Sequence, residues 1–191
     1  STDGRTDLTL GGGYHYYEGD HFGEVIWARF AGDSEIRDRY YENDATKSDF
    51  NIFSQLNREI APGLNAYVDL QLRRVDYNFL GVDANGSPLE QVVSHSFFNP
   101  KAGLFYQLNQ RAEAYASFGV AQREPNRNDY VESSANSQPI PEKLFNTEVG
   151  YRWTGRRTNF GANFYHMLYR DQLVLNGQIN DVGANTRINV P

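Results

Sequence analysis

Cysteine is absent from this 191-residue chain, methionine occurs once, and no long hydrophobic run is present. The lack of cysteine excludes disulfide scaffolds, thiolate zinc sites and cysteine nucleophiles. A membrane-spanning helix needs about 20 consecutive apolar residues, and no segment approaches that length. Basic side chains are few, with 18 Lys and Arg against 24 Asp and Glu. The net charge of −6 leaves no basic face to neutralise phosphates, which argues against nucleic acid as a partner.

Motifs for catalysis and for cofactor binding are missing as well. The four histidines, His15, His21, His95 and His166, do not have the spacing of metal ligands. The sequence contains no nucleophile elbow, no zinc-protease motif, no P-loop and no dinucleotide-binding fingerprint. We therefore expect no enzymatic activity, no catalytic residues, no cofactor and no metal site.

Aromatic residues and glycine, by contrast, are plentiful. Thirteen Tyr, 12 Phe and 2 Trp make up 14% of the chain, beside 17 Gly. Aromatic residues favour strands, whereas the residues that favour helices are in short supply. No segment has a helical period. The composition therefore indicates an all-β protein.

Strict alternation of apolar and polar residues marks the strands. In residues 65–73, Ala66, Val68, Leu70 and Leu72 point to one face and the polar residues between them to the other. The same pattern predicts eight strands, most of them about 9–11 residues long, which is the length that a tilted strand needs to cross a bilayer. They are residues 8–16, 22–30, 50–56, 65–73, 100–108, 113–121, 145–153 and 160–168.

The connections between these strands alternate in length. Short polar turns are predicted at residues 18–20, 58–63, 109–111 and 154–157, and long hydrophilic loops at 31–48, 75–96, 123–143 and from 170 onward. Short turns on one side and long loops on the other are typical of a transmembrane β-barrel. We therefore predict an antiparallel up-and-down meander of about eight strands, part of such a barrel, with both chain ends on the long-loop side.

The two faces of the predicted strands differ in character. We expect one face to contact lipid and the other to line a wet lumen, because the polar face carries many charges. The expected lipid side consists of Ala66, Val68, Leu70, Leu72, Ala114, Ala116, Phe118 and Val120, and the expected lumen side of Asp69, Gln71, Arg73, Glu113 and Ser117. A soluble β-sandwich that acts as a binding module is one alternative. A complete small eight-stranded barrel with a structural or adhesive role is another.

One segment carries a family resemblance. Arg123-Glu124-Pro125-Asn126-Arg127-Asn128-Asp129-Tyr130 follows a predicted strand, and a polar loop leads to Pro141-Glu142-Lys143 and a strand that contains Glu148-Val149-Gly150-Tyr151. This combination resembles the barrel of TonB-dependent outer-membrane receptors, most of all those of the Bacteroidetes group. Residues 1–191 are then expected to be a partial β-barrel domain without the plug domain of such receptors.

The resemblance implies a role in transport at the outer membrane of a Gram-negative bacterium. The expected cargo is a bulky, scarce nutrient, in the first place an iron–siderophore or similar chelate. The expected partners are outer-membrane lipid, the small-molecule nutrient, and the TonB complex, which would be reached only through the missing plug.

Three arginines are the candidate substrate-binding residues. Arg123, Arg127 and Arg187 lie on predicted outer loops, and a guanidinium pairs well with the carboxylate or catecholate oxygens of an anionic chelate. The alternative is that they balance the nearby Glu124, Asp129 and Glu132.

Overall fold

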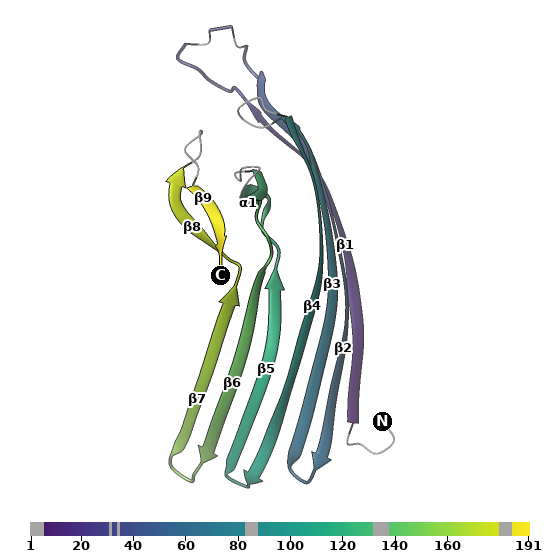
Figure 1. The fold of residues 1–191 in the computed structure, drawn as a ribbon, viewed down its shortest axis with the longest axis vertical. Coiled ribbons are helices and arrows are strands. Elements are labelled where there is room, and N and C mark those ends of the chain that lie inside the picture. Colours follow the sequence, from purple (N-terminus) through teal and green to yellow (C-terminus); the bar gives the residue numbers. More distant parts are fainter. Residues whose placement is uncertain (1–5, 31, 34, 83–87, 132–137, 180–184) are drawn as a thin grey trace.

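The computed structural model describes residues 6–30, 32–33, 35–82, 88–131, 138–179 and 185–191. Seven strands form one antiparallel sheet in the order β1 to β7, and two more form a separate hairpin (Figure 1). The sheet consists of β1 (Thr6–Glu24), β2 (Arg39–Ala61), β3 (Leu64–Val82), β4 (Pro88–Asn109), β5 (Ala112–Arg123), β6 (Glu142–Thr154) and β7 (Asn159–Arg170). The hairpin consists of β8 (Gln172–Ile179) and β9 (Asn185–Val190), and a five-residue helix, α1 (Arg127–Val131), lies between β5 and β6. No helix in the described part of the chain is long and apolar enough to cross a membrane.

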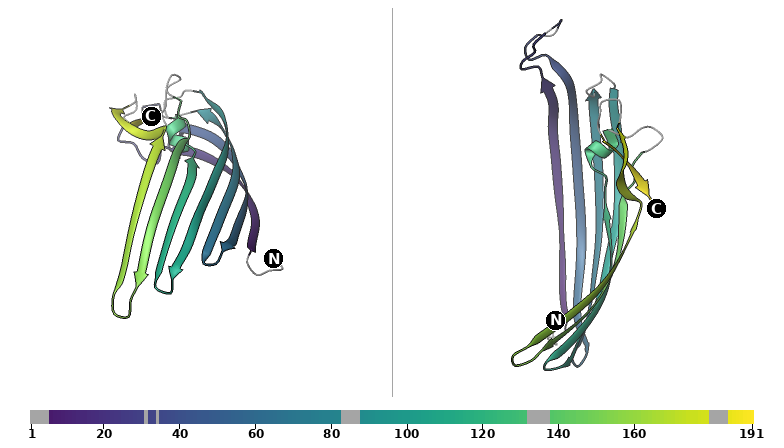
Figure 2. Two further views of the ribbon diagram at one scale, coloured as in Figure 1. Left: turned by 60° about the horizontal axis from the view of Figure 1, so that its bottom comes forward. Right: turned by 90° about the vertical axis from the view of Figure 1, so that its left-hand side faces the viewer.

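Every strand of the sheet pairs with its neighbour in sequence, which confirms the predicted meander. Short turns join β2 to β3, β4 to β5 and β6 to β7 at one end, where turns were predicted. Figure 2 shows the sheet as a curved wall, in which β1 to β4 rise above β5 to β7. Within the described residues β1 and β7 are the two edges of this wall, so neither a closed small barrel nor two facing sheets is formed.

The first predicted hairpin is wrong. The predicted turn at residues 18–20 lies inside β1, where Gly19 is paired with Ala45 of β2. The predicted strand at 22–30 ends at Glu24, and the residues after it form a loop. A glycine between two acidic residues is a local turn signal, but here the hydrogen-bonded ladder with β2 keeps the chain extended. Within the described residues the sheet therefore has seven strands.

The same correction reverses the expected position of the N-terminal side of the chain. Thr6 is paired with Arg58, next to the turn between β2 and β3. The first described strand therefore begins at the short-turn end, whereas both chain ends were expected on the long-loop side (Figure 1).

Strands β2, β3 and β4 are two to three times as long as predicted, with 23, 19 and 22 residues. Much of the predicted loops 31–48 and 75–96 is therefore strand, and the tail after residue 170 contains β8 and β9. The sequence pattern missed these extensions because the large apolar side chains change from one face of β3 to the other. Leu70 and Leu72 are exposed, whereas Val75 and Phe79, which point to the opposite face, are buried. Such a reversal is expected where a strand passes from lipid into water, and it breaks the alternation by which the strands were predicted.

The alternating faces themselves are as predicted. One face, which we call the apolar face, includes Ile52, Leu70, Leu72 and Phe98, because these residues are paired across β2, β3 and β4. The other, which we call the inner face, carries polar contacts such as Gln55 Nε2 to Asp69 Oδ2 (3.3 Å) and Asn99 Nδ2 to Gln71 Oε1 (3.1 Å). Toward the long-loop end the inner face becomes apolar and packs against α1 through a cluster of Ala45, Phe79 and Tyr130.

Aromatic rings on the inner face lie over glycines of the neighbouring strand. The directly opposed pairs are Phe53 with Gly11, Tyr67 with Gly103, and Tyr115 with Gly150. At position 103 a Cβ atom would lie 2.6 Å from the Tyr67 ring and 3.0 Å from the backbone oxygen of Ala116. The glycine therefore allows the ring to lie against the wall instead of projecting from it.

We predict that Gly103→Val destabilises the intact protein by about 1–3 kcal/mol, because the Tyr67 ring must leave its site and the strand backbone must shift. Gly161→Val is the matched control, since its Cβ would meet only the Tyr151 backbone oxygen, at 3.9 Å. Urea unfolding midpoints of the two variants in detergent provide the measurement. Equal midpoints would show that the ring does not need the glycine.

A second prediction concerns the two faces. Leu70→Arg places a charge on the apolar face and is expected to cost about 2–4 kcal/mol if that position lies near the bilayer midplane. Gln71→Arg is the control, because the neighbouring side chain points to the polar inner face. The stability of each variant is measured after folding into vesicles. The assignment of the faces is wrong if both substitutions cost the same.

Candidate functional site

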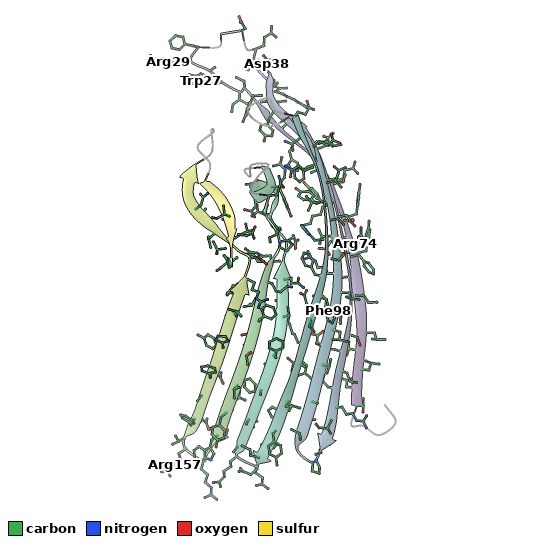
Figure 3. All side chains as sticks on the ribbon, in the orientation of Figure 1. Trp27, Arg29, Asp38, Arg74, Phe98 and Arg157 are labelled. Carbon is green, nitrogen blue, oxygen red and sulfur yellow. The ribbon has the colours of Figure 1, made fainter. Side chains whose placement is uncertain are left out.

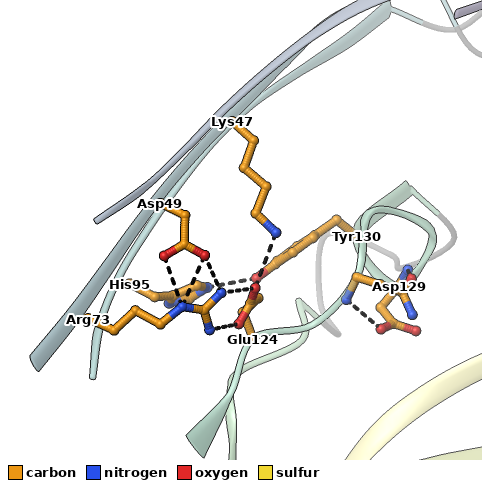
Figure 4. Close-up of polar contacts among 8 residues, drawn as sticks. Lys47, Asp49, Arg73, His95, Glu124, Asp129 and Tyr130 are labelled. Atoms are coloured by element: carbon orange, nitrogen blue, oxygen red, sulfur yellow. Dashed lines mark hydrogen bonds and ion pairs between the residues drawn. The ribbon is translucent and has the colours of Figure 1, made fainter. Parts of the chain in front are cut away.

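A polar cluster joins the segment after β5 to the inner face of β2, β3 and β4 (Figure 4). At its centre, Arg73 of β3 donates from Nε and Nη2 to the Asp49 carboxylate, at 3.0 and 2.5 Å. Its Nη1 and Nη2 donate to the two oxygens of Glu124, at 2.7 and 2.9 Å. One planar guanidinium thus holds two carboxylates, a geometry that lysine could not provide.

Glu124 is the carboxylate that comes from outside the sheet. Lys47 Nζ lies 3.1 Å from its Oε1, so two cations share it, and its side chain is only 15% exposed. Burial by itself would raise the pKa of Glu124, but hydrogen bonds, first of all those from Arg73, outweigh burial and lower the pKa to about 2. Glu124 and Arg73 are therefore both fully ionised at neutral pH.

The chain turns into α1 directly after Glu124. Asn126 and Asp129 cap this short helix reciprocally: the Asp129 amide donates to Asn126 Oδ1 (3.1 Å), and the Asn126 amide donates to Asp129 Oδ2 (2.8 Å). This is the arrangement of a capping box. It orients the following residues toward the wall.

Tyr130 fixes α1 against the inner face. Its ring is buried beside Phe79, and its hydroxyl lies 2.7 Å from Nε2 of His95. Burial raises the pKa of the Tyr130 phenol, and the nearby carboxylates of Glu124 and Asp129 raise it further. The tyrosine is therefore neutral, and it attaches the helix to β3 and β4.

The three predicted arginines have different surroundings. Arg127 points to the wall, where its Nη2 donates to Asn43 Oδ1 of β2 at 2.7 Å. Arg123 pairs with Glu142 (2.6 Å) and remains 71% exposed, and Arg187 pairs with Asp129 (3.1 Å) and is 41% exposed. Of the carboxylates expected to balance them, Asp129 does so for Arg187, whereas Glu124 is held by Arg73 and Lys47. Glu132 lies outside the described residues.

Arg123 and Arg187, which are 64 positions apart in sequence, line one cavity of about 360 Å³. Glu124, Asn126 and Asp129 form part of its wall, and Leu173 and Leu175 of β8 form an apolar side. The β8–β9 hairpin is attached to the sheet at this point, because the Leu173 amide donates to Glu142 (2.7 Å) and Asn189 Nδ2 donates to the backbone oxygens of Asp171 and Ile140 (2.6 and 2.9 Å). We call this space the arginine cavity.

Sequence reasoning missed the central role of Arg73, Asp49 and Lys47. Arg73 was expected to line the lumen, which agrees with its place on the inner face, but its partners were not predicted. The signal that could have found the cluster is Glu124, an acidic residue next to Pro125 at the end of a strand. Among the described residues, no group of three or more His, Asp or Glu side chains could hold a metal ion.

One family model matches the whole chain. Residues 1–191 match the family described as "TonB dependent receptor-like, beta-barrel". No curated protein matches the sequence.

Solved structures share the fold at low sequence identity. The copper transporter OprC aligns with a TM-score of 0.78 and 15% identity over 97% of this chain. The FrpB iron transporter of Neisseria meningitidis (F5-1 variant) aligns over 100% with a TM-score of 0.65 and 20% identity. The ferripyoverdine receptor of Pseudomonas aeruginosa aligns over 95% with a TM-score of 0.64 and 16% identity. The chain spans 31%, 30% and 26% of these three proteins.

We predict that Glu124→Gln loosens α1, because it removes the charge that Arg73 and Lys47 share. A hydrogen bond to a charged group is worth about 1.5–3 kcal/mol, so amide hydrogen exchange in residues 127–131 should become faster by at least about tenfold. Glu113→Gln is the control, since Glu113 forms an ion pair with the exposed Arg152, far from α1. Unchanged exchange in the Glu124 variant would contradict the role of the ion pair.

The same contact should depend on pH. Folding lowers the pKa of Glu124 from 4.5 to about 2, so its contribution to stability is complete above about pH 4.5 and is lost as the pH falls toward 2. In the wild type the protection of α1 should decrease within this window. The Glu124→Gln variant should show no such step.

Proposed function

The chain belongs to the family of TonB-dependent receptors, as part of their β-barrel, and from this premise we propose that the whole protein imports a bulky, scarce nutrient. Members of this family are outer-membrane proteins of Gram-negative bacteria and are transporters rather than enzymes. This chain is therefore assigned to the outer membrane. The first candidate for its cargo is an iron–siderophore or similar anionic chelate.

The observation that supports this cargo most directly is the arginine cavity. Two guanidiniums face it together with two leucines, and the two carboxylates in its wall, Glu124 and Asp129, are each held in ion pairs. This combination suits a ligand with anionic oxygens and an apolar body. Guanidinium groups bind carboxylate and catecholate oxygens through pairs of parallel hydrogen bonds. Some of the similar solved structures are described as iron transporters or as a ferripyoverdine receptor, and one as a copper transporter. These names support nutrient import in general.

Arg123 and Arg187 are available to a ligand because their ion pairs are exposed on the guanidinium side. The carboxylates of Glu142 and Asp129 are only 11% and 7% exposed, so these ion pairs stay in place and a chelate would bind the exposed side of each guanidinium. Arg127 also belongs to the proposed site, but its bond to Asn43 suggests that it acts by positioning α1.

The transport step would use parts of the receptor beyond this wall. The TonB complex is proposed to act through a plug domain, and the apolar face is proposed to contact outer-membrane lipid. Within this chain, α1 and the β8–β9 hairpin would form one side of the outer mouth, held to the wall by Arg73, Glu124 and Tyr130.

We predict that Arg123→Ala and Arg187→Ala each weaken binding of a ferric tris-catecholate, which is anionic, by at least about tenfold, the loss expected for a charge-assisted hydrogen bond. Binding of a neutral ferric tris-hydroxamate should change much less. Arg157→Ala, in the turn at the opposite end of the sheet, is the control. The measurement is equilibrium binding to the intact receptor in detergent.

Arg127→Ala separates direct contact from positioning. If Arg127 positions α1, its replacement should accelerate amide exchange in residues 127–131 and weaken binding of both chelates alike. Unchanged catecholate affinity in all three arginine variants would refute the proposed site.

A further inference from the structure

The apolar face is not uniform, because a groove of about 580 Å³ crosses β1 to β4. Its walls include Leu10, Ile52, Leu70, Leu72 and Phe98, and its floor lies at Gly12 and Ser54. Gly12 is directly opposed to Ile52, and Ser54 lies between Leu10 and Leu70 in the paired strands. Two short residues among large apolar neighbours therefore form the depression.

The backbone itself maintains the groove at Gly12. A Cβ atom at this position would lie 2.8 Å from the backbone oxygen of Asn51, closer than real Cβ contacts. A side chain cannot fill the depression here unless β1 and β2 move apart. The groove is thus a permanent feature of this part of the wall.

A polar group of residues borders the groove at its long-loop end. Arg74 follows Leu72 on the same face and is directly opposed to Phe50 and Ser96. Its guanidinium is 60% exposed, pairs with Asp76 (2.9 Å) and donates to the hydroxyl of Ser94 (3.2 Å). Figure 3 shows Arg74 just beyond Phe98 along the wall, with Arg157 at the opposite end.

Further cations lie along this border. Lys143 and Arg170 are opposed to each other on β6 and β7, and the guanidinium of Arg170 lies over the Phe145 ring at 5.4 Å. Gln122, which is opposed to Lys143, donates to the backbone oxygen of Phe98 (2.8 Å), which places these residues at the height of the groove's upper end. Arg74 is therefore the cation at the upper end of the groove, and Lys143 and Arg170 continue the cationic border beyond it on β6 and β7.

We propose that this groove holds one acyl chain of a phosphorylated outer-leaflet lipid, whose phosphate binds Arg74. The acyl chain would fill the space above Gly12 and Ser54, and the phosphate would accept hydrogen bonds from the guanidinium and from the neighbouring serine hydroxyls. The ion pair with Asp76 is exposed and therefore weak, so it does not prevent the guanidinium from binding a phosphate. This lipid site lies on the opposite face of the wall from the arginine cavity and does not depend on the transported nutrient.

The test uses the intact receptor, reconstituted in vesicles of phosphatidylcholine with a minor fraction of phosphatidic acid that has the same acyl chains. Native mass spectrometry after extraction counts the lipids that remain bound. The wild type should retain one phosphatidic acid. Ser54→Phe fills the groove and should lower the occupancy of the groove by phosphatidic acid by about tenfold or more. Arg74→Gln should remove most of the preference for phosphatidic acid over phosphatidylcholine, as expected for the loss of one charge-assisted contact.

Two controls separate the site from general effects of mutation. Ala162→Phe adds an aromatic ring to the apolar face of β7, and Arg157→Gln removes a cation at the opposite end of the wall; both should retain the lipid as the wild type does. The proposal is overturned if Ser54→Phe retains as much lipid as Ala162→Phe. It is also overturned if the wild type holds both lipids equally, or if Ser54→Phe dissociates a dimer of the receptor, since a second copy would then occupy the groove.

Discussion

Every backbone group of a strand in hydrocarbon must find its partner on a neighbouring strand, because hydrocarbon offers no other hydrogen-bonding atoms. The continuous pairing from β1 to β7 satisfies this requirement between neighbours. The ladder also explains why β1 stays extended through an apparent turn, and why β2, β3 and β4 continue beyond the apolar band. Once a wall of paired strands exists, it provides two surfaces with different solvents, and the functional features of the chain divide between them.

Arg73 and Arg74 illustrate this division. They are consecutive in β3, so their side chains point to opposite faces. Arg73 points inward and binds Asp49 and Glu124, which holds the segment before α1 against the wall. Arg74 points outward and borders the apolar groove. The two arginines also stand where the burial pattern of the strand reverses, and so they mark the border between the two environments.

The inner site depends on contacts that hold a loop to a rigid wall. Glu124 forms ion pairs with β2 and β3, Arg127 donates a hydrogen bond to β2, and Tyr130 contacts β3 with its buried ring and β4 with its hydroxyl. A loop held at these points keeps Asp129 in a fixed position beside Arg123, the last residue of β5, and Asp129 in turn holds Arg187 of β9. Binding residues on loops supported by a sheet are a common arrangement, because the scaffold limits the entropy that a ligand must remove.

The sequence by itself determined the all-β class, the two faces of the strands and three of the four short turns, because alternation and turn chemistry act over a few residues. It also pointed to the family, through the segment around Glu124 and Pro125. The tertiary structure alone decided the length of β1, the extension of β2 to β4 and the partners of the arginines. These depend on which strands lie side by side: Arg73 meets Glu124 across 51 positions and Arg127 meets Asn43 across 84. A local pattern cannot report such contacts, since the register of long strands and the path of a loop over the wall are set by the whole sheet.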